Sequence, residues 1–388
     1  MLKRVGLILA LPLVAMALAS CSSTSHQTLA VQIDAATTST FNLEAIAYFP
    51  DKLTVHPGDT VQFHSNFRGE PHTVTFGAMI NRGLAALDKL TPQQQLQLQG
   101  PPPEAKDVPQ FFPLNADPAT AEPNQSAAQP CFLDTGVPPP AKACPKHAQP
   151  EFDGTQAFYS SGWVGADQTY SMKLASDLKP GTYQWICLVH GPEMRGKLTV
   201  VAKGQKADKP AAVTSAGQKK LDGFIAKLKP VAAKAGTDAK PGEVSAGIGI
   251  PNDRLFPAGG MTFAPKVVSI PVGGTVTWNL SFHTVSFNAP EDARPAFVKA
   301  ANGTVSFNRK AIEPANSPKP PEPAQGSPNG PPPPVTFDGG TWDGTGFHSS
   351  GSANALGDFF YKLTFTKAGT YKYECLIHPD MLGTVKVG

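Results

Sequence analysis

Charged residues are scarce in this sequence, and it has no cluster of basic side chains. Of its 388 residues only 16% are Asp, Glu, Lys or Arg, and the formal net charge is +3. A nucleic-acid site depends on Lys and Arg side chains that neutralise phosphates, and here no basic stripe extends beyond Lys219, Lys220 and the scattered lysines near them. The composition therefore disfavours long charged helices and predicts no nucleic-acid partner.

Long hydrophobic runs are also missing, apart from one near the N-terminus. A basic pair precedes the apolar run Val5–Leu18, which is short for a transmembrane helix and has the layout of a secretory signal. The run ends in Leu18-Ala19-Ser20-Cys21, which resembles the lipobox of bacterial lipoproteins. We therefore expect a signal peptide over 1–20, a lipid on Cys21, a flexible tether over 21–29, and a mature protein anchored to a bacterial membrane in the periplasm or at the cell surface. The alternative is an ordinary cleaved signal with an incidental thiol.

Cysteine is rare, with five in the chain, and the remaining four are of two kinds. Cys131 and Cys144 lie in a polar, proline-rich stretch without a metal-like histidine spacing, so a disulfide is expected in an oxidising compartment. Cys187 and Cys375 each end an alternating, strand-like run, and each is followed three residues later by a histidine. The pattern around Cys187 and Cys375 is therefore not that of a disulfide pair.

An internal repeat explains the similarity of the second pair. Four landmarks recur in the same order: Leu53–Phe63 with Val268–Trp278, Pro71–Phe76 with Phe282–Phe287, Phe158–Gly162 with Phe347–Gly351, and Gly181–His190 with Gly369–His378. The matched segments alternate as β-strands do and are separated by Gly turns. The sequence therefore predicts an all-β fold with two tandem β-sandwich domains, over 30–202 and 247–388, joined by a Lys/Ala/Pro-rich linker over 203–246.

Each copy is interrupted by a long Pro-rich insertion. The insertions cover about 78–153 in the first copy and 289–338 in the second, and their composition cannot fill a core alone, so surface loops with little regular structure are expected. A short helix is predicted over Met79–Leu90. In the linker, apolar residues recur at helical spacing and predict a helix over Ser215–Ala235.

Strand parity places the histidines and cysteines in the sandwich interiors. Alternate residues of a strand share a face, so Cys187 points the same way as Tyr183 and Trp185, and Cys375 repeats the pattern. The same rule puts His72 and His283 on apolar faces. A lone inward Cys or His is more often an ordinary core residue, but here the whole pattern occurs twice.

Two imidazoles, a thiolate and a distant thioether are the ligand set of a blue-copper site. On these motifs both copies resemble the cupredoxins, the family of plastocyanin, azurin and amicyanin, across nearly all of the chain outside the insertions and linker. The resemblance implies Greek-key sandwiches with one copper in each domain. It implies the ligands His72, Cys187, His190 and Met194 in the first copy and His283, Cys375, His378 and Met381 in the second. The loop to Met194 is one residue longer than the compact, amicyanin-like loop to Met381.

The function that this resemblance implies is one-electron transfer between a redox protein donor and acceptor. An enzyme is not expected, because the His-x-His pairs of multicopper oxidases are missing and the residues before the cysteines, Ile186 and Glu374, differ from the histidine of copper nitrite reductases. The apolar Leu188, Val189, Leu376 and Ile377 are expected to form a docking surface. Copper delivery or resistance, and an interaction protein with copper as a structural staple, are the alternatives.

Overall fold

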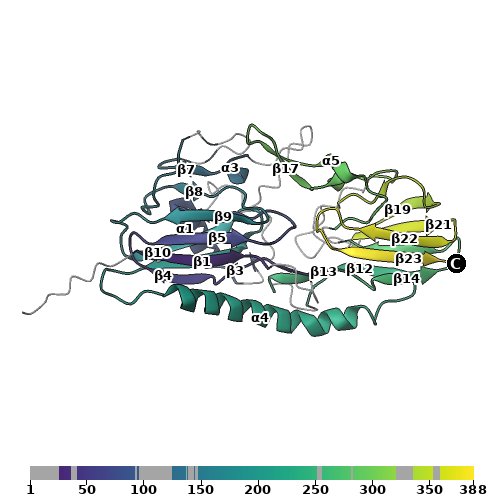
Figure 1. Ribbon diagram of the computed structural model, residues 1–388, viewed down its shortest axis with the longest axis horizontal. Coiled ribbons are helices and arrows are strands. Elements are labelled where there is room, and N and C mark those ends of the chain that lie inside the picture. Colours follow the sequence, from purple (N-terminus) through teal and green to yellow (C-terminus); the bar gives the residue numbers. More distant parts are fainter. Residues whose placement is uncertain are drawn as a thin grey trace, which may run out of the picture.

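The computed structural model describes residues 26–35, 42–91, 94–95, 125–136, 138, 144, 147–250, 256–280, 283–319, 335–352 and 359–388. Strands dominate these residues, and the expected all-β fold is confirmed. They form two β-sandwiches side by side, with one long helix running along both (Figure 1). The predicted signal peptide, Cys21 and most of the tether lie outside the described residues.

The first sandwich has a four-stranded sheet with the order β3-β1-β5-β9 and a six-stranded sheet with the order β4-β11-β10-β6-β8-β7. Its strands are β1 (Thr28–Ile33), β3 (Tyr48–Phe49), β4 (Lys52–Val55), β5 (Thr60–Ser65), β6 (Thr75–Phe76), β7 (Cys131–Leu133), β8 (Phe158–Ser160), β9 (Gln168–Lys173), β10 (Gly181–Cys187) and β11 (Gly191–Val200). The inward residues of both sheets form one buried cluster, which includes Val31, Phe63, Trp185 and Leu198. Burial of this apolar surface holds the two sheets face to face.

The second sandwich also has two sheets, a six-stranded one with the order β19-β21-β15-β12-β13-β2 and a five-stranded one with the order β14-β23-β22-β16-β20. Its strands are β12 (Glu243–Ile248), β13 (Ala258–Ala264), β14 (Val267–Ile270), β15 (Thr275–Asn279), β16 (Ser286–Phe287), β19 (Val335–Trp342), β20 (His348–Ser349), β21 (Phe359–Phe365), β22 (Gly369–Glu374) and β23 (Leu382–Val387). Its core is a separate cluster around Trp278, Phe287 and Tyr373. Strand β2 (Leu43–Ala45) belongs to the N-terminal part of the chain, yet it pairs antiparallel with β13.

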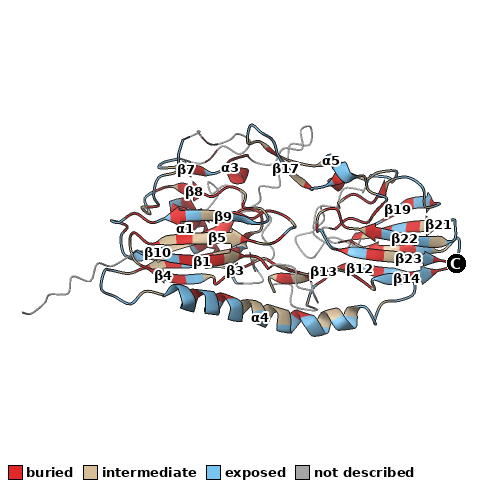
Figure 2. Cartoon of the chain, in the orientation of Figure 1, coloured by how far each residue is buried: buried red, intermediate tan, exposed pale blue. Residues whose placement is uncertain are grey.

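The linker helix is present and longer than expected. Helix α4 covers Pro210–Ala235 and begins with a proline, whose fixed φ suits the first helical turn. Its apolar residues Phe224 and Leu228 pack into a small cluster that contains Phe49 from the first half and Ala258 from the second. Figure 2 shows α4 exposed along much of its length. No helix among the described residues is long and apolar enough to cross a membrane.

The insertions contain more regular structure than their composition suggested. The first insertion forms α1 (Ala78–Leu87), α3 (Gln125–Ala128) and β7, and the second forms the short helices η2 (Glu291–Ala293) and α5 (Arg309–Ile312) and the hairpin of β17 (Phe297–Lys299) and β18 (Val305–Phe307). A disulfide joins Cys131 to Cys144, with the Cα atoms 5.5 Å apart. Helix α1 confirms the helix predicted over Met79–Leu90. The expectation of loops with little structure was wrong for the other elements, because their few apolar residues pack onto the sandwiches.

This packing also overturns the predicted docking surface. Leu188 is buried under Met79 and Ile80 of α1, and Leu376 is buried under Ala293 and its neighbours in the second insertion. Val189 is buried in the core of the first sandwich. Leu188, Val189 and Leu376 are therefore covered by the chain itself, whereas Ile377 is half-buried.

Candidate metal centres

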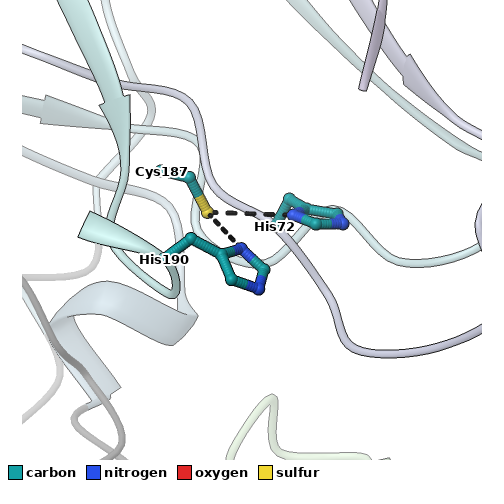
Figure 3. A group of neighbouring side chains, drawn as sticks. All are labelled: His72, Cys187 and His190. Carbon is teal, nitrogen blue, oxygen red and sulfur yellow. Dashed lines mark hydrogen bonds between the residues drawn. The ribbon is translucent and has the colours of Figure 1, made fainter. Parts of the chain in front are cut away.

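Strand pairing brings the first histidine and the cysteine together across 115 residues of sequence. Thr75 of β6 pairs with Ile186 of β10, so the residues just before β6 lie beside the end of β10. The register of β10 against β11 shifts between Ile186 and Cys187. Such a bulge re-aims the following side chain. His72, Cys187 and His190 then converge from two loops and a strand end (Figure 3).

The three side chains of the first centre approach one another through chemically suitable atoms. The Sγ of Cys187 lies 3.9 Å from Nδ1 of His72 and 3.6 Å from Nδ1 of His190. His72 and Cys187 are fully buried, and the side chain of His190 is 14% exposed. The candidate ligands named from the sequence therefore share one small, nearly closed space.

The second centre repeats this geometry. The Sγ of Cys375 lies 3.8 Å from Nδ1 of His283 and 3.6 Å from Nδ1 of His378. The two Nδ1 atoms are 2.9 Å apart, and all three residues are buried. Ser286 and Phe287 of β16 pair with Glu374 and Tyr373 of β22, as β6 pairs with β10.

The sulfur–nitrogen distances fit a shared metal ion. With bonds of about 2.3 Å to sulfur and 2.0 Å to nitrogen, a trigonal ligand set separates S from N by about 3.7 Å. The four observed S–N distances lie between 3.6 and 3.9 Å, which is long for a hydrogen bond but close to this value. Two imidazoles and one thiolate in this arrangement suit copper.

The two methionines are placed where the cores surround the cysteines. Met194 belongs to the same buried cluster as Cys187, and Met381 to the same cluster as Cys375. Both are at most 1% exposed. In the second loop Cys375 donates its backbone N–H to the carbonyl of Met381 at 3.0 Å, which closes the loop around His378.

The surroundings of both cysteines favour the thiolate, which is the form that binds a metal. Burial by itself would raise the pKa of Cys187, but the imidazoles of His190 and His72 outweigh it and bring the pKa to about 5. Burial also opposes ionisation of Cys375, and His283 and His378 hold its pKa well below the usual range.

Backbone groups that sequence patterns did not single out also contact the sulfurs. The N–H of Thr73 donates to Sγ of Cys187 at 3.3 Å, and the N–H of Thr284 donates to Sγ of Cys375 at 3.4 Å. Each threonine hydroxyl in turn accepts the N–H of the residue after the cysteine. The recurrence of Thr after each inward histidine was the available signal for this role.

The repeated Ser-Ser-Gly landmark supports the histidine-bearing segments. Ser161 accepts the backbone N–H of Val74 at 2.8 Å, and Ser350 accepts that of Val285 at 2.9 Å. These bonds fix the backbone two residues after His72 and His283. The Ser-Ser-Gly segments therefore hold the backbone that carries the histidines in place, a role that the repeat alone did not reveal.

Two buried carboxylates contact the outer nitrogens of the histidines. Asp34 Oδ2 lies 3.0 Å from Nε2 of His72. Glu70 lies between the halves, with Oε1 3.2 Å from Nε2 of His190 and Oε2 3.1 Å from Nε2 of His378. Neither acid was predicted from the sequence. One signal was available, because the position of Glu70, two residues before His72, is occupied by Ser281 in the second copy.

Burial and hydrogen bonding set the charge of this acidic group. Burial would raise the pKa of Glu70, but its interactions with Glu44, His190 and His378 hold that pKa well below the usual range. Burial and the neighbouring Glu70 raise the pKa of Glu44 well above its usual value. Glu70 is therefore the carboxylate of this pair.

Comparison with known proteins gives only distant similarities. No protein-family model matches the chain, and no curated protein matches it. Among solved structures it is similar to dithionite-reduced auracyanin from Roseiflexus castenholzii (15% identity, 45% of this chain and 96% of that chain, TM-score 0.22) and to auracyanin A, a "blue" copper protein from Chloroflexus aurantiacus (18%, 45% and 98%, 0.21). An oxidised amicyanin variant also matches (17%, 45% and 82%, 0.21). Identities and TM-scores this low do not assign a function to the chain.

Proposed function

We propose that this chain is an extracytoplasmic one-electron carrier with two mononuclear type 1 copper sites, built as two cupredoxin-like domains. The observation that carries the proposal is the duplicated Cys-His-His cluster, with S–N distances of 3.6–3.9 Å in both copies. Met194 and Met381 are proposed as the weak axial ligands, because each is buried in the core that holds its cysteine. A redox protein donor and acceptor are the proposed partners.

The protein residues prepare the sites for rapid electron exchange. Bound copper would supply the Cu(I)/Cu(II) couple. The strand pairs β6–β10 and β16–β22 fix the ligand backbones, and the Thr and Ser hydrogen bonds hold them in place. Buried ligands exclude water, and rigid ones change little between oxidation states, so little reorganisation accompanies each electron.

Burial also distinguishes electron transfer from copper delivery. A delivery protein must release its metal to a partner, which requires access to the ligands. Here the ligands of both centres are buried or nearly so, and α1 and the second insertion cover the adjacent loops. The geometry therefore favours a resident metal over an exchangeable one.

Copper loading tests the proposal. We expect the purified protein to bind two coppers per chain and to show thiolate-to-copper charge-transfer colour when oxidised, since two complete ligand sets are present. Metal analysis and visible spectroscopy measure both quantities. One copper per chain after loading would disprove the second site, and a colourless oxidised protein would disprove the type 1 assignment.

We further propose that a lipid on Cys21 anchors the protein to a bacterial membrane. The support is the Leu-Ala-Ser-Cys sequence after an apolar run. Cys21→Ala should abolish incorporation of labelled fatty acid and release the protein from membranes or stall its processing, with copper binding unchanged. Membrane fractionation provides the measurement. A wild-type chain that incorporates no fatty acid would contradict the anchor.

A further inference from the structure

The shared carboxylate of Glu70 connects the two candidate centres. His190 belongs to the first centre and His378 to the second. Oε2 of Glu70 is hydrogen-bonded to Nε2 of His378 at 3.1 Å, and Oε1 forms an ion-pair contact of 3.2 Å with Nε2 of His190. In both histidines Nδ1 faces the cysteine, so Nε2 faces outward toward Glu70. An imidazole that binds a metal through Nδ1 carries its proton on Nε2, where it donates to an acceptor. A carboxylate offers one oxygen to each of two such donors.

The residues that surround this bridge close the space between the halves. Glu70 is 9% exposed, and the side chain of His378 is 6% exposed. The ring of Phe67 lies 6.1 Å from that of His72 and 6.5 Å from that of His378, so it packs between residues of both centres. The loop that carries Phe67 and Glu70 from the first half thus reaches the ligand loop of the second.

The outer faces of the two remaining histidines differ. His72 faces the buried carboxylate of Asp34 at 3.0 Å. Strand register makes Gly247 the counterpart of Asp34. Val31 pairs with Phe63, and Val244 pairs with Trp278, which is the repeat equivalent of Phe63. Asp34 lies three residues after Val31, and Gly247 lies three residues after Val244. At Gly247 an added Cβ would lie 2.5 Å from Nε2 of His283. The second centre therefore has bare backbone where the first has a carboxylate.

The two cysteine sulfurs also differ in the number of hydrogen bonds that they accept. Among the described residues, Cys375 Sγ accepts backbone N–H groups from Thr284 and from His378, whereas Cys187 Sγ accepts that of Thr73. A carboxylate on an imidazole ligand increases the basicity of that ligand and favours the oxidised metal. Hydrogen bonds to a thiolate reduce its donation and favour the reduced metal. Both differences place the higher reduction potential at the second centre.

We propose that Glu70 joins the two centres into one directional pair, in which an electron passes from the His72–Cys187–His190 centre to the His283–Cys375–His378 centre. The proposal rests on the proposed function. With copper bound in both centres, the reduced first centre would lose one electron and the oxidised second centre would gain it, so no further reactant is needed. The connection runs from His190 through the carboxylate of Glu70 to His378, and Asp34 holds the first centre at the lower potential.

Potentials of single-site proteins test the direction. Cys375→Ser leaves the first centre and Cys187→Ser leaves the second, so spectroelectrochemistry of each variant reports one potential. We expect the lower potential in Cys375→Ser, and an upward shift when Asp34→Asn is added to it. Asparagine keeps the oxygen that accepts the N–H groups of Ala35 and Ala45, so folding is preserved. Equal or reversed potentials would overturn the direction.

The rate of internal electron exchange tests the bridge. After a one-electron pulse to the fully oxidised protein, we expect a first-order redistribution between the centres that is independent of protein concentration and several-fold slower in Glu70→Gln. The amide has one acceptor oxygen and would turn an NH₂ group toward the N–H of one ligand. Glu151→Gln, at the exposed ion pair with Lys173, is the matched control and should leave the rate unchanged.

Two outcomes separate the bridge from the proposed function. A concentration-dependent rate, or a rate unaltered by Glu70→Gln, in a blue protein with two coppers would disprove the bridge alone. A protein without copper or without colour would disprove the proposed function itself.

Discussion

Cys375→Ser should yield a chain that binds one copper and keeps about half of the visible absorption, because oxygen in place of the thiolate removes the soft donor that gives the colour. Cys187→Ser should remove the other half. Each cysteine lies in its own core cluster, so the loss of one ligand leaves the other cluster intact. Copper analysis and absorption spectra of both variants provide the measurement.

The disulfide offers a control for this experiment. The double change Cys131→Ser and Cys144→Ser also removes sulfur atoms, but these residues lie in the first insertion and bind each other. Colour and copper content should remain at the wild-type level in this variant. If either single change at Cys187 or Cys375 bleaches both centres, the two sites share ligands and are not independent.

Gly196→Ala and Gly383→Ala should each destabilise one sandwich by about 3 kcal/mol, the upper end of the usual cost of overpacking a core. Gly196 lies opposite Trp185 in the β10–β11 pair, and Gly383 lies opposite Tyr373 in the β22–β23 pair. At both glycines an added Cβ would overlap the buried aromatic ring. Thermal unfolding of the metal-free proteins measures the change.

The linker helix supplies the control for the glycine variants. Gly223 lies in the exposed part of α4, and an added Cβ there meets nothing within 4 Å. Gly223→Ala should leave stability unchanged or raise it by about 0.5–1 kcal/mol, since alanine favours a helix. If Gly196→Ala unfolds at the same temperature as the wild-type protein, the Trp185 ring moves aside without cost and the prediction is wrong.

The candidate ligands could be predicted from the sequence because the information is local and occurs twice. The alternation of residues along the strands predicted that Cys187, at the end of β10, and Cys375, directly after β22, point into the sandwich cores. Both are buried in the structure. Ile186 alternates with Cys187 and lies on the opposite face of β10, away from the core of the sandwich. It is nevertheless buried, because α1 covers that face.

The relation between the halves could not be predicted in this way. Glu70 touches His378 across 308 residues of sequence, and Gln125 exchanges hydrogen bonds with the backbone of Val305 across 180. No periodicity encodes such contacts, because they depend on how two finished sandwiches meet. The sequence signal for a contact between the halves was a difference between equivalent positions of the two copies, such as Glu70 in the first and Ser281 in the second.

The pairing of β2 with β13 has a consequence for any attempt to separate the halves. A fragment that begins at the linker would retain β12 and β13 but lose Leu43–Ala45, so the backbone groups of β13 that face β2 would become an open sheet edge. Open edges recruit strands from other molecules. We therefore expect a fragment that begins at the linker to self-associate more readily than the whole chain, because β2 covers this edge in the intact protein.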